Sequence, residues 1–300
     1  KKLYLKLIGI DRNNFLFQNL LGTTFLQLKE YDEAIKHLDI SIKLNPNFAV
    51  SFGNKGIAHA EKKQYREAIN NYDKAINLNK KFFDAYLNKG IALKNIHKYD
   101  DALKYYYFCI KVNAGNPKIY SNLGNLLLEQ KKFKEALKVY DKAISLHGEF
   151  AEVYNSRGET NQQLGNYKKA IEDYSKALKI NNNLSYIKGK ILFAKMHINE
   201  WDNFDLQISQ LIEEIDDKKK TIIPFPLLSL IDDPKMHKDV AEKYSRDNFP
   251  FFSNKKQITP ELKDKINIGY YSADFKDHAV LHLISDVFRN HNKSQFNLYG

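Results

Sequence analysis

The chain has 300 residues, and 47 Lys and Arg against 36 Asp and Glu give a formal net charge of +11. Hydrophobic residues make up 43% of the sequence, enough to bury a core, so extensive intrinsic disorder is excluded. A single cysteine, Cys109, excludes a disulfide scaffold and fits a reducing compartment, so we expect a cytoplasmic protein. The longest apolar stretch, residues 222–231, is about half as long as a membrane-spanning helix of ~20 residues, so no membrane partner is expected.

The positive charge consists almost entirely of lysine. Only five arginines occur, and they are scattered along the chain instead of clustered: Arg12, Arg66, Arg157, Arg246 and Arg289. Bidentate recognition of phosphates and guanine edges favours arginine. We therefore expect solvated helix faces and no nucleic-acid partner.

A repeat of 34 residues runs through the first two thirds of the chain. An aromatic residue is followed three positions later by alanine at Tyr31 and Ala34, Tyr65 and Ala68, Tyr99 and Ala102, Phe133 and Ala136, and Tyr167 and Ala170. Nine positions before each of these aromatic residues stands a glycine: Gly22, Gly56, Gly90, Gly124 and Gly158. Seven positions after them stand Leu38, Tyr72, Tyr106, Tyr140 and Tyr174. The fixed spacing predicts five copies of one supersecondary unit.

This pattern resembles the tetratricopeptide repeat, a pair of helices that buries its apolar stripe by stacking on the next pair. The resemblance implies that Gly and Ala stand where the two helices of one unit cross closely, because a larger side chain would overpack the crossing. The aromatic residues are expected to fill wider gaps between units. Cys109 lies on the frame of Ala75, Ala143 and Ala177, which predicts a small buried residue and no reactive thiol.

The 34-residue spacing, and the positions at which it is lost, divide the chain into five predicted segments. Residues 1–12 are expected to be the tail of an upstream repeat, residues 13–182 five repeats, and residues 183–220 an atypical capping repeat. The proline-punctuated residues 221–260 are expected to be an ordered connector, and residues 261–300 the start of a catalytic lobe. Tyr4 stands 34 positions before Leu38, so we expect the chain to begin inside an earlier repeat. A single strand-helix-strand unit cannot cover both faces of a parallel sheet, so we expect the chain to end inside a larger domain.

The last segment changes period from helical to strand-like. "KINIGYYS" alternates like a strand, "AVLHLISDVFRNH" is apolar at helical spacing, and "QFNLYG" follows as a second strand. In open parallel sheets ligands bind at the carboxyl ends of strands, so residues 272–278 are the expected site, with Ser272, Asp274 and His278 as candidates. The alternative is that Asp277 only caps the helix and His278 lies in its first turn. His278 and His282 share helical spacing, but two ligands do not close a metal site, and no metal is expected.

The run "INIGYYSADFKDHAVLHL" resembles the start of the catalytic region of the family 41 glycosyltransferases, the O-GlcNAc transferase and SPINDLY group. The matching residues are Gly269, Tyr270, Ser272, Asp274, Phe275 and His278. Tyr271 replaces a Val, and Lys276 with Asp277 replaces a Gly-Asn of the animal enzymes, which leaves the acceptor preference open. "NEWDNFD" around Trp201 and "PFPLLSLIDDP" resemble the family's junction after the last repeat.

The resemblance implies a mainly α chain, a tetratricopeptide-repeat superhelix followed by a connector and the first βαβ unit of a Rossmann-like lobe of GT-B type. It implies an inverting, metal-independent protein O-glycosyltransferase that moves a sugar from a nucleotide donor to Ser or Thr of proteins recognised by the repeats. GlcNAc from UDP-GlcNAc is the favoured donor, and fucose or another sugar is the alternative. His278 would orient or deprotonate the acceptor hydroxyl, and Ser272 and Asp274 would line the acceptor cleft. The donor site of such enzymes lies mainly in a second lobe, so these 300 residues are expected to bind no cofactor and to be inactive alone.

One slot on the first helix of successive repeats holds Asn54, Asn88 and Asn122. They resemble the asparagine ladder that holds peptide backbone on the concave face of O-GlcNAc transferase, and amides can both donate and accept. Leu20 and Ser156 occupy the slot in the outer repeats, and a satisfied polar face is the alternative. The alternative for the whole chain is a repeat scaffold that binds partner proteins without catalysis.

Overall fold

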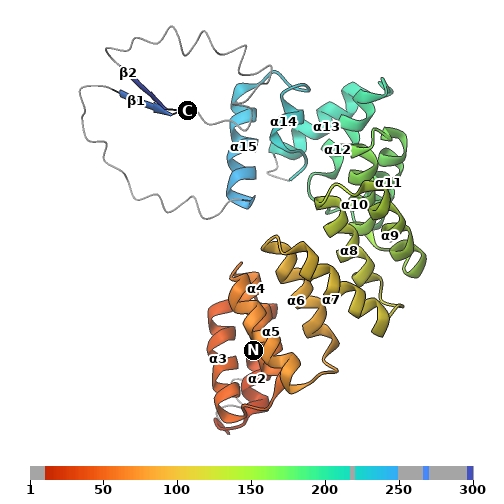
Figure 1. Cartoon of the computed structure of the whole chain (residues 1–300). Coiled ribbons are helices and arrows are strands. Elements are labelled where there is room, and N and C mark those ends of the chain that lie inside the picture. Colours follow the sequence, from red (N-terminus) through yellow and green to blue (C-terminus); the bar gives the residue numbers. More distant parts are fainter. Residues whose placement is uncertain (1–10, 217–219, 249–265, 270–295, 300) are drawn as a thin grey trace. The chain divides into compact units, whose positions relative to one another are not determined.

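A computed structural model describes residues 11–216, 220–248, 266–269 and 296–299, which contain fourteen helices and two strands (Figure 1). The chain divides into two compact units, residues 1–244 and 245–300. None of the described helices is long and apolar enough to cross a membrane.

The described part of the first unit starts, at residue 11, with ten helices arranged as five consecutive pairs, α2 to α11. The pairs are α2 (Phe15–Gln27) with α3 (Tyr31–Leu44), α4 (Ala49–Glu61) with α5 (Tyr65–Leu78), α6 (Phe83–Asn95) with α7 (Tyr99–Val112), α8 (Pro117–Glu129) with α9 (Phe133–Leu146), and α10 (Ala151–Gln163) with α11 (Tyr167–Ile180). The two helices of a pair contact each other, and the second helix contacts the first helix of the next pair. The predicted stack of five helix pairs is therefore confirmed.

The five turns within the pairs share one backbone geometry. Each has a residue in the left-handed region, with φ between 58° and 75°: Lys29, Lys63, His97, Lys131 and Gly165. The residue after it donates its N–H to a carbonyl five positions earlier, as from Glu30 to Phe25, over N···O distances of 2.8 to 3.0 Å. This is the Schellman motif, which satisfies the last carbonyls of the first helix and reverses the chain into the second.

In the second to fifth repeats the glycine and the second aromatic residue form the crossing of the two helices, and in the first repeat Gly22 faces Leu38 in the same way. A Cβ placed on Gly56 would lie 2.5 Å from Cε1 of Tyr72. The same distance is 2.9 Å for Gly90 and Tyr106 and 2.7 Å for Gly158 and Tyr174, and it is shortest for Gly124 and Tyr140. The four tyrosines of this slot are at most 2% exposed. The prediction that glycine permits a close crossing is confirmed.

These tyrosines pack both within and between units, so the expectation that aromatic residues fill gaps between units is confirmed in part. Tyr72 packs on Gly56 of its own repeat and belongs to a buried cluster with Ala85 and Ala92 of the next repeat. The other aromatic slot, exemplified by Tyr65, is only half-buried, because it opens the second helix at the edge of the stack.

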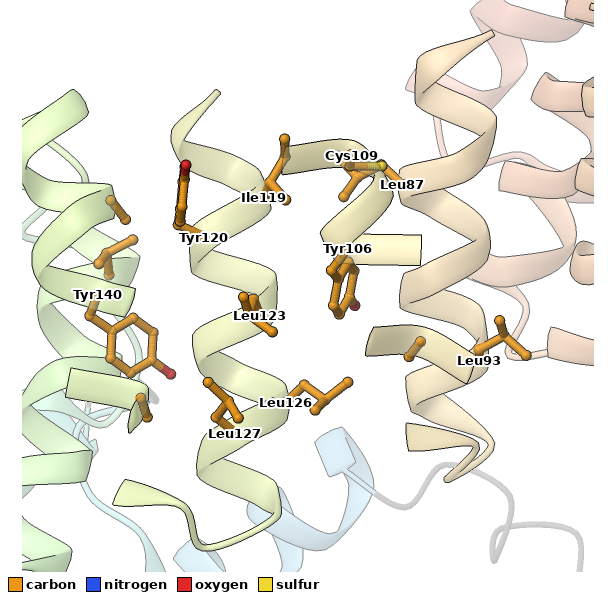
Figure 2. Packing of buried hydrophobic residues seen from close by; sticks show 14 residues of the cluster. Leu87, Leu93, Tyr106, Cys109, Ile119, Tyr120, Leu123, Leu126, Leu127 and Tyr140 are labelled. Atoms are coloured by element: carbon orange, nitrogen blue, oxygen red, sulfur yellow. The ribbon is translucent and has the colours of Figure 1, made fainter. Parts of the chain in front are cut away.

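The largest buried cluster joins the third and fourth repeats. Figure 2 shows α8 between α7, which carries Tyr106 and Cys109, and α9, which carries Tyr140. Leu123 and Leu126 of α8 belong to this cluster and are at most 3% exposed. Cys109 is fully buried there, and burial raises the pKa of its thiol to about 11, as expected for a packed and unreactive residue.

Four further helices follow the repeats. They are α12 (Ile187–His197), α13 (Phe204–Asp216), α14 (Pro224–Leu227) and α15 (Pro234–Asn248). Ile187 packs onto the last repeat beside Tyr174, while Leu192 joins Leu211 of α13 and Leu227 of α14 in a separate apolar cluster. The end of the repeat stack is thus covered by α12, and α13 and α14 pack on α12.

The second unit contains two short strands, β1 (Ile266–Gly269) and β2 (Phe296–Tyr299). They pair in parallel, with Ile266 opposite Phe296 and Gly269 opposite Tyr299. Both strands and their parallel pairing agree with the sequence analysis. Two strands do not by themselves make a Rossmann-like lobe, which stays a prediction.

Candidate functional site

The first helices of the repeats form one continuous surface. Each of α2, α4, α6 and α8 contacts the first helix of the next repeat as well as its own partner. We call this surface the first-helix face. Asn54, Asn88 and Asn122 lie on α4, α6 and α8 and are each half-buried.

Asn54 is used inside the stack. Its Nδ2 donates to Oδ1 of Asn19 at 3.2 Å and to Oγ1 of Thr23 at 3.1 Å, both on α2. Oδ1 of Asn19 also accepts from the buried hydroxyl of Ser51 at 3.1 Å. The amide of Asn54 therefore ties the first repeat to the second.

Lys190 of α12 occupies the same slot and has the same geometry. Its Nζ donates to Oδ1 of Asn155 at 2.9 Å and forms an ion pair with Glu159, both on α10. Asn155 precedes Lys190 by as many positions as Asn19 precedes Asn54, and Glu159 corresponds in the same way to Thr23. The residue in this slot thus contacts two fixed positions on the first helix of the preceding repeat.

At Asn88 those two positions hold Gly53 and Ile57, which have no side-chain acceptor. Within the described part of the chain the side-chain amide of Asn88 has no hydrogen-bond partner, although the residue is half-buried. Its donors and its acceptor are therefore available to a bound molecule.

Asn122 is an intermediate case. Leu87 and Ile91 stand at the two partner positions and offer no acceptor. The Nδ2 group donates instead to the carbonyl of Lys118, one turn earlier on α8, at 2.9 Å. Oδ1 of Asn122 keeps its capacity to accept.

A cavity of about 350 Å³ lies beside Asn88, between α4, α5 and α6. Its apolar wall consists of Ile57, Ala60, Tyr65, Tyr72, Ile91 and Ala92. Its polar rim consists of Glu61, Lys63, Asn88 and Asn95. Burial, and then the negative charge of Glu61, raise the pKa values of Tyr65 and Tyr72, so both hydroxyls stay protonated at neutral pH. An apolar pocket with a few polar groups at its mouth suits one side chain of a polypeptide.

The other candidate residues, Ser272, Asp274 and His278, lie outside the described residues. In the parts that the structure does describe, no group of three or more His, Cys, Asp or Glu side chains could hold a metal ion. The three asparagines share one slot, so their position alone predicts one common role. The difference among them lies in the residues 35 and 31 positions before each, which either offer an acceptor or do not.

Models of the tetratricopeptide repeat match much of the helical region. Models described as "Tetratricopeptide repeat" match residues 17–48 and 151–184, and a "TPR repeat" model matches residues 56–96 and 124–165. No curated protein matches the chain.

Solved structures share the fold at low sequence identity. The chain is similar to a chain of the APC/C heterotetramer Cut9–Hcn1, with 16% identity over 80% of this chain and 45% of that chain and a TM-score of 0.64. It is also similar to PilF of Pseudomonas aeruginosa, with 17% identity over 68% of this chain and 92% of that one and a TM-score of 0.58.

A third similar structure is a tetratricopeptide repeat protein of Parabacteroides merdae, with 19% identity over 64% of this chain and 75% of that one and a TM-score of 0.56. Identities this low show the fold alone. Together with the family models and the 34-residue frame, they establish that residues 17–184 form an array of tetratricopeptide repeats.

Proposed function

We propose that this protein is a scaffold that binds an extended segment of a partner protein along the first-helix face. The observation that carries the proposal is the amide of Asn88, half-buried and without a partner among the described residues, at the rim of an apolar cavity of about 350 Å³. Tetratricopeptide-repeat proteins bind peptides along their concave surface, which supports this reading.

The chemistry of the cavity defines what it would hold. An amide can donate to a peptide carbonyl and accept from a peptide N–H at once, so it fixes backbone without reading sequence. The apolar wall with Ile57, Ile91 and Tyr72 would take one large apolar side chain of the same segment. The ligand class is therefore an extended segment with one apolar anchor residue.

The test begins with peptides selected from a random phage-displayed library against the complete chain. Fluorescence anisotropy then gives their Kd for the wild type, Asn88→Ala and Asn54→Ala. Loss of one hydrogen-bonding side chain is worth about 0.5–1.5 kcal/mol, so Asn88→Ala weakens binding about 2- to 12-fold. Asn54→Ala serves as the matched control, because it lowers the unfolding midpoint and leaves the Kd of the folded protein unchanged.

The proposal fails if no peptide is selected, or if the selected peptides bind Asn88→Ala as tightly as the wild type. It also fails if Asn54→Ala weakens binding as much as Asn88→Ala under conditions in which both variants are folded. Circular dichroism at the binding temperature establishes that they are.

A second candidate is a protein glycosyltransferase, favoured by the parallel pairing of β1 with β2 at the two strands predicted from the sequence. In this reading His278 orients or deprotonates a Ser or Thr hydroxyl, Ser272 and Asp274 line the acceptor cleft, and the donor is UDP-GlcNAc. The matching family models are repeat models, so this candidate is based on the sequence resemblance and on the strand pair. Transfer of labelled GlcNAc by the full-length protein, lost in His278→Ala with donor binding retained, would support it. Unchanged transfer by that variant would remove His278 from the mechanism.

A further inference from the structure

We propose that an exposed aromatic surface on α7, together with the cavity beside it, binds an acidic amphipathic helix of a partner protein. Tyr107, Phe108 and Val112 are 56%, 41% and 58% exposed, and we call them the α7 patch. The cavity has a volume of about 520 Å³ and lies between α5, α6 and α7. It shares no lining residue with the cavity beside Asn88, so the inference is independent of the proposed peptide binding.

The α7 patch departs from the 34-residue frame. The slot of Phe108 holds an exposed lysine in the second, fourth and fifth repeats, at Lys74, Lys142 and Lys176. The slot of Tyr107 holds an aspartate in the first, second and fourth repeats, at Asp39, Asp73 and Asp141. The third repeat thus exposes two aromatic side chains where most other repeats expose charge. Exposed apolar patches of this kind mark surfaces that bind a partner.

Phe108 makes the contact that a lysine makes in the preceding repeat. Its ring packs on that of Tyr86, with the ring centroids 4.5 Å apart. Phe52 stands 34 positions before Tyr86, and Nζ of Lys74 lies 5.7 Å from the centroid of its ring. A lysine covers a ring with its apolar stem and keeps its ammonium group in water, whereas Phe108 exposes apolar surface at the same place. The fold therefore accepts lysine in this slot and does not require the phenyl ring.

The cavity continues the apolar surface of the patch. Its apolar wall consists of Ile69 of α5, Tyr86 and Leu93 of α6, and Tyr105 and Phe108 of α7. Phe108 belongs to both the wall and the patch, so an apolar side chain in the cavity and a second one on the patch can come from one segment. Anchors one turn apart on a helix have this arrangement.

The wall offers little to the backbone of an extended segment. Ile69, Leu93 and Phe108 have no polar side-chain atoms, and the hydroxyl of Tyr105 already accepts from Nζ of Lys89 at 2.6 Å. An extended segment would leave its N–H and C=O groups unbonded on the side that faces this wall, whereas a helix bonds its own. The occupant is therefore helical, in contrast to the segment proposed for the first-helix face.

The charge around the cavity and the patch selects an acidic partner. Lys89, Lys98 and Lys104 line the cavity with one carboxylate, Asp101. Lys89 is paired with Asp73, and Lys104 with Asp101 at 3.0 Å. Lys98 and, beside the patch, Lys111 have no ion-pair partner in the part of the chain that the structure describes.

The carboxylates of α7 lie away from the patch. Asp100 and Asp101 are both in the first turn, and from Ala102 to Val112 the helix has two lysines and no carboxylate. Lys111 follows Phe108 by three positions, which places it on the adjoining helix surface. Carboxylates beside the apolar face of a partner helix complement this charge, and the net charge of +11 on the chain favours their approach.

The test selects binders of the complete chain from a phage-displayed library of amphipathic helices, in which the apolar face and the charges beside it are randomised. Fluorescence anisotropy of the selected peptides then gives their Kd for the wild type, Phe108→Lys and Lys111→Glu. Phe108→Lys inserts the residue that the frame has in this slot, and circular dichroism establishes that the variant is folded. Lys142→Glu is the matched control, because Lys142 occupies the same slot in the next repeat and lies outside the patch.

We expect the selected helices to carry aromatic or large aliphatic residues one turn apart, with Asp or Glu beside them. Phe108→Lys weakens their binding about 10-fold or more although it adds a positive charge, because an apolar anchor is lost. Lys111→Glu weakens binding about 2- to 5-fold, as expected for an exposed charge pair. Lys142→Glu leaves the Kd unchanged, and so does Asn88→Ala, which separates this site from the first-helix face.

Four results overturn the proposal. They are selection of no helix or of basic helices, equal binding by folded Phe108→Lys, equal binding of a peptide with proline at its centre, and a loss in Asn88→Ala as large as in Phe108→Lys. Self-association of the wild type that Phe108→Lys abolishes assigns the patch to a second copy of the chain, and it also overturns the proposal. Analytical ultracentrifugation of both proteins measures it.

Discussion

Gly56 shows how one missing side chain sets the distance between two helices. The ring of Tyr72 occupies the space into which a Cβ at residue 56 would project, and its Cε1 would lie 2.5 Å from that atom. Contacts between carbon atoms are most favourable at about 3.5–4.0 Å. The glycine and the buried tyrosine are therefore complementary, which is why they recur together in the frame of 34 residues.

Replacing Gly56 with Ala is expected to destabilise the protein. Overpacking costs about 1–3 kcal/mol, and the better helix propensity of alanine returns about 1 kcal/mol, so the net loss is up to about 2 kcal/mol. Urea unfolding followed by circular dichroism measures it. Gly148→Ala is the control, because nothing lies within 4 Å of a Cβ at that position. Equal midpoints for the two variants would contradict the close crossing.

Ion pairs join the second helix of one repeat to the first helix of the next. They link residues 16 positions apart: Asp39 with Lys55, Asp73 with Lys89, and Asp141 with Arg157. At the third junction the same two positions hold Tyr107, which is 56% exposed, and the buried Leu123. That junction, between α7 and α8, is therefore held by apolar packing and lacks this ion pair.

Arg157 is the member of this series that matters most for stability. It also binds Asp173 of its own repeat through Nε and Nη2, with Nη2···Oδ1 at 2.6 Å, and Asp173 is 4% exposed. Arg157→Met leaves that buried carboxylate with Asn161 alone, and removing one partner of a buried pair costs about 3–5 kcal/mol. Because the arginine side chain is 24% exposed, we expect Arg157→Met to lower the free energy of unfolding by about 2–3 kcal/mol. Chemical unfolding measures this loss.

Lys55→Met is the control for Arg157→Met, because its partner Asp39 is 51% exposed and exposed pairs are worth less than about 1 kcal/mol. If the two variants lose the same stability, the burial of Asp173 does not determine the strength of the junction.

The chain divides into two units, and shortening the chain tests whether the second unit stabilises the first. The helical unit contains the repeats and the helices that cover their end, and Ile187 of α12 is 1% exposed against the last repeat. Removing α12 would expose this apolar surface, whereas residues beyond α15 belong to the other unit.

A chain shortened to residues 1–248 is therefore expected to unfold at the same temperature as the complete chain. A chain shortened to residues 1–184 is expected to unfold at a lower temperature, because it loses the contacts of Ile187 with Tyr174 and Ala177. Thermal unfolding of the three chains, followed by circular dichroism, makes the comparison. A lower midpoint for residues 1–248 would show that the second unit stabilises the first.

The repeat array could be predicted from sequence because its determinants are periodic. The positions of Gly56 and Tyr72 recur every 34 residues along the repeats. The roles of Asn54 and Asn88 could not be predicted from their shared slot, because the preceding repeat decides whether an acceptor is in reach. The cavity beside the α7 patch could not be predicted either, because its walls come from three helices that meet only in the fold. The role of His278 stays a prediction.

If the first-helix face binds a peptide as proposed, the distribution of bonded and unbonded amides along it would limit the length of the recognised motif. The slot residues Asn54 and Lys190 are hydrogen-bonded inside the stack. Of the slot's amides, only that of Asn88 is unbonded among the described residues, and Asn122 keeps its Oδ1 as an acceptor while its Nδ2 donates to Lys118. Packed helices stand about 8–10 Å apart, and an extended chain advances about 3.3 Å per residue. A ligand held by both amides is thus pinned at two places about three residues apart, which favours short linear motifs over long threaded chains.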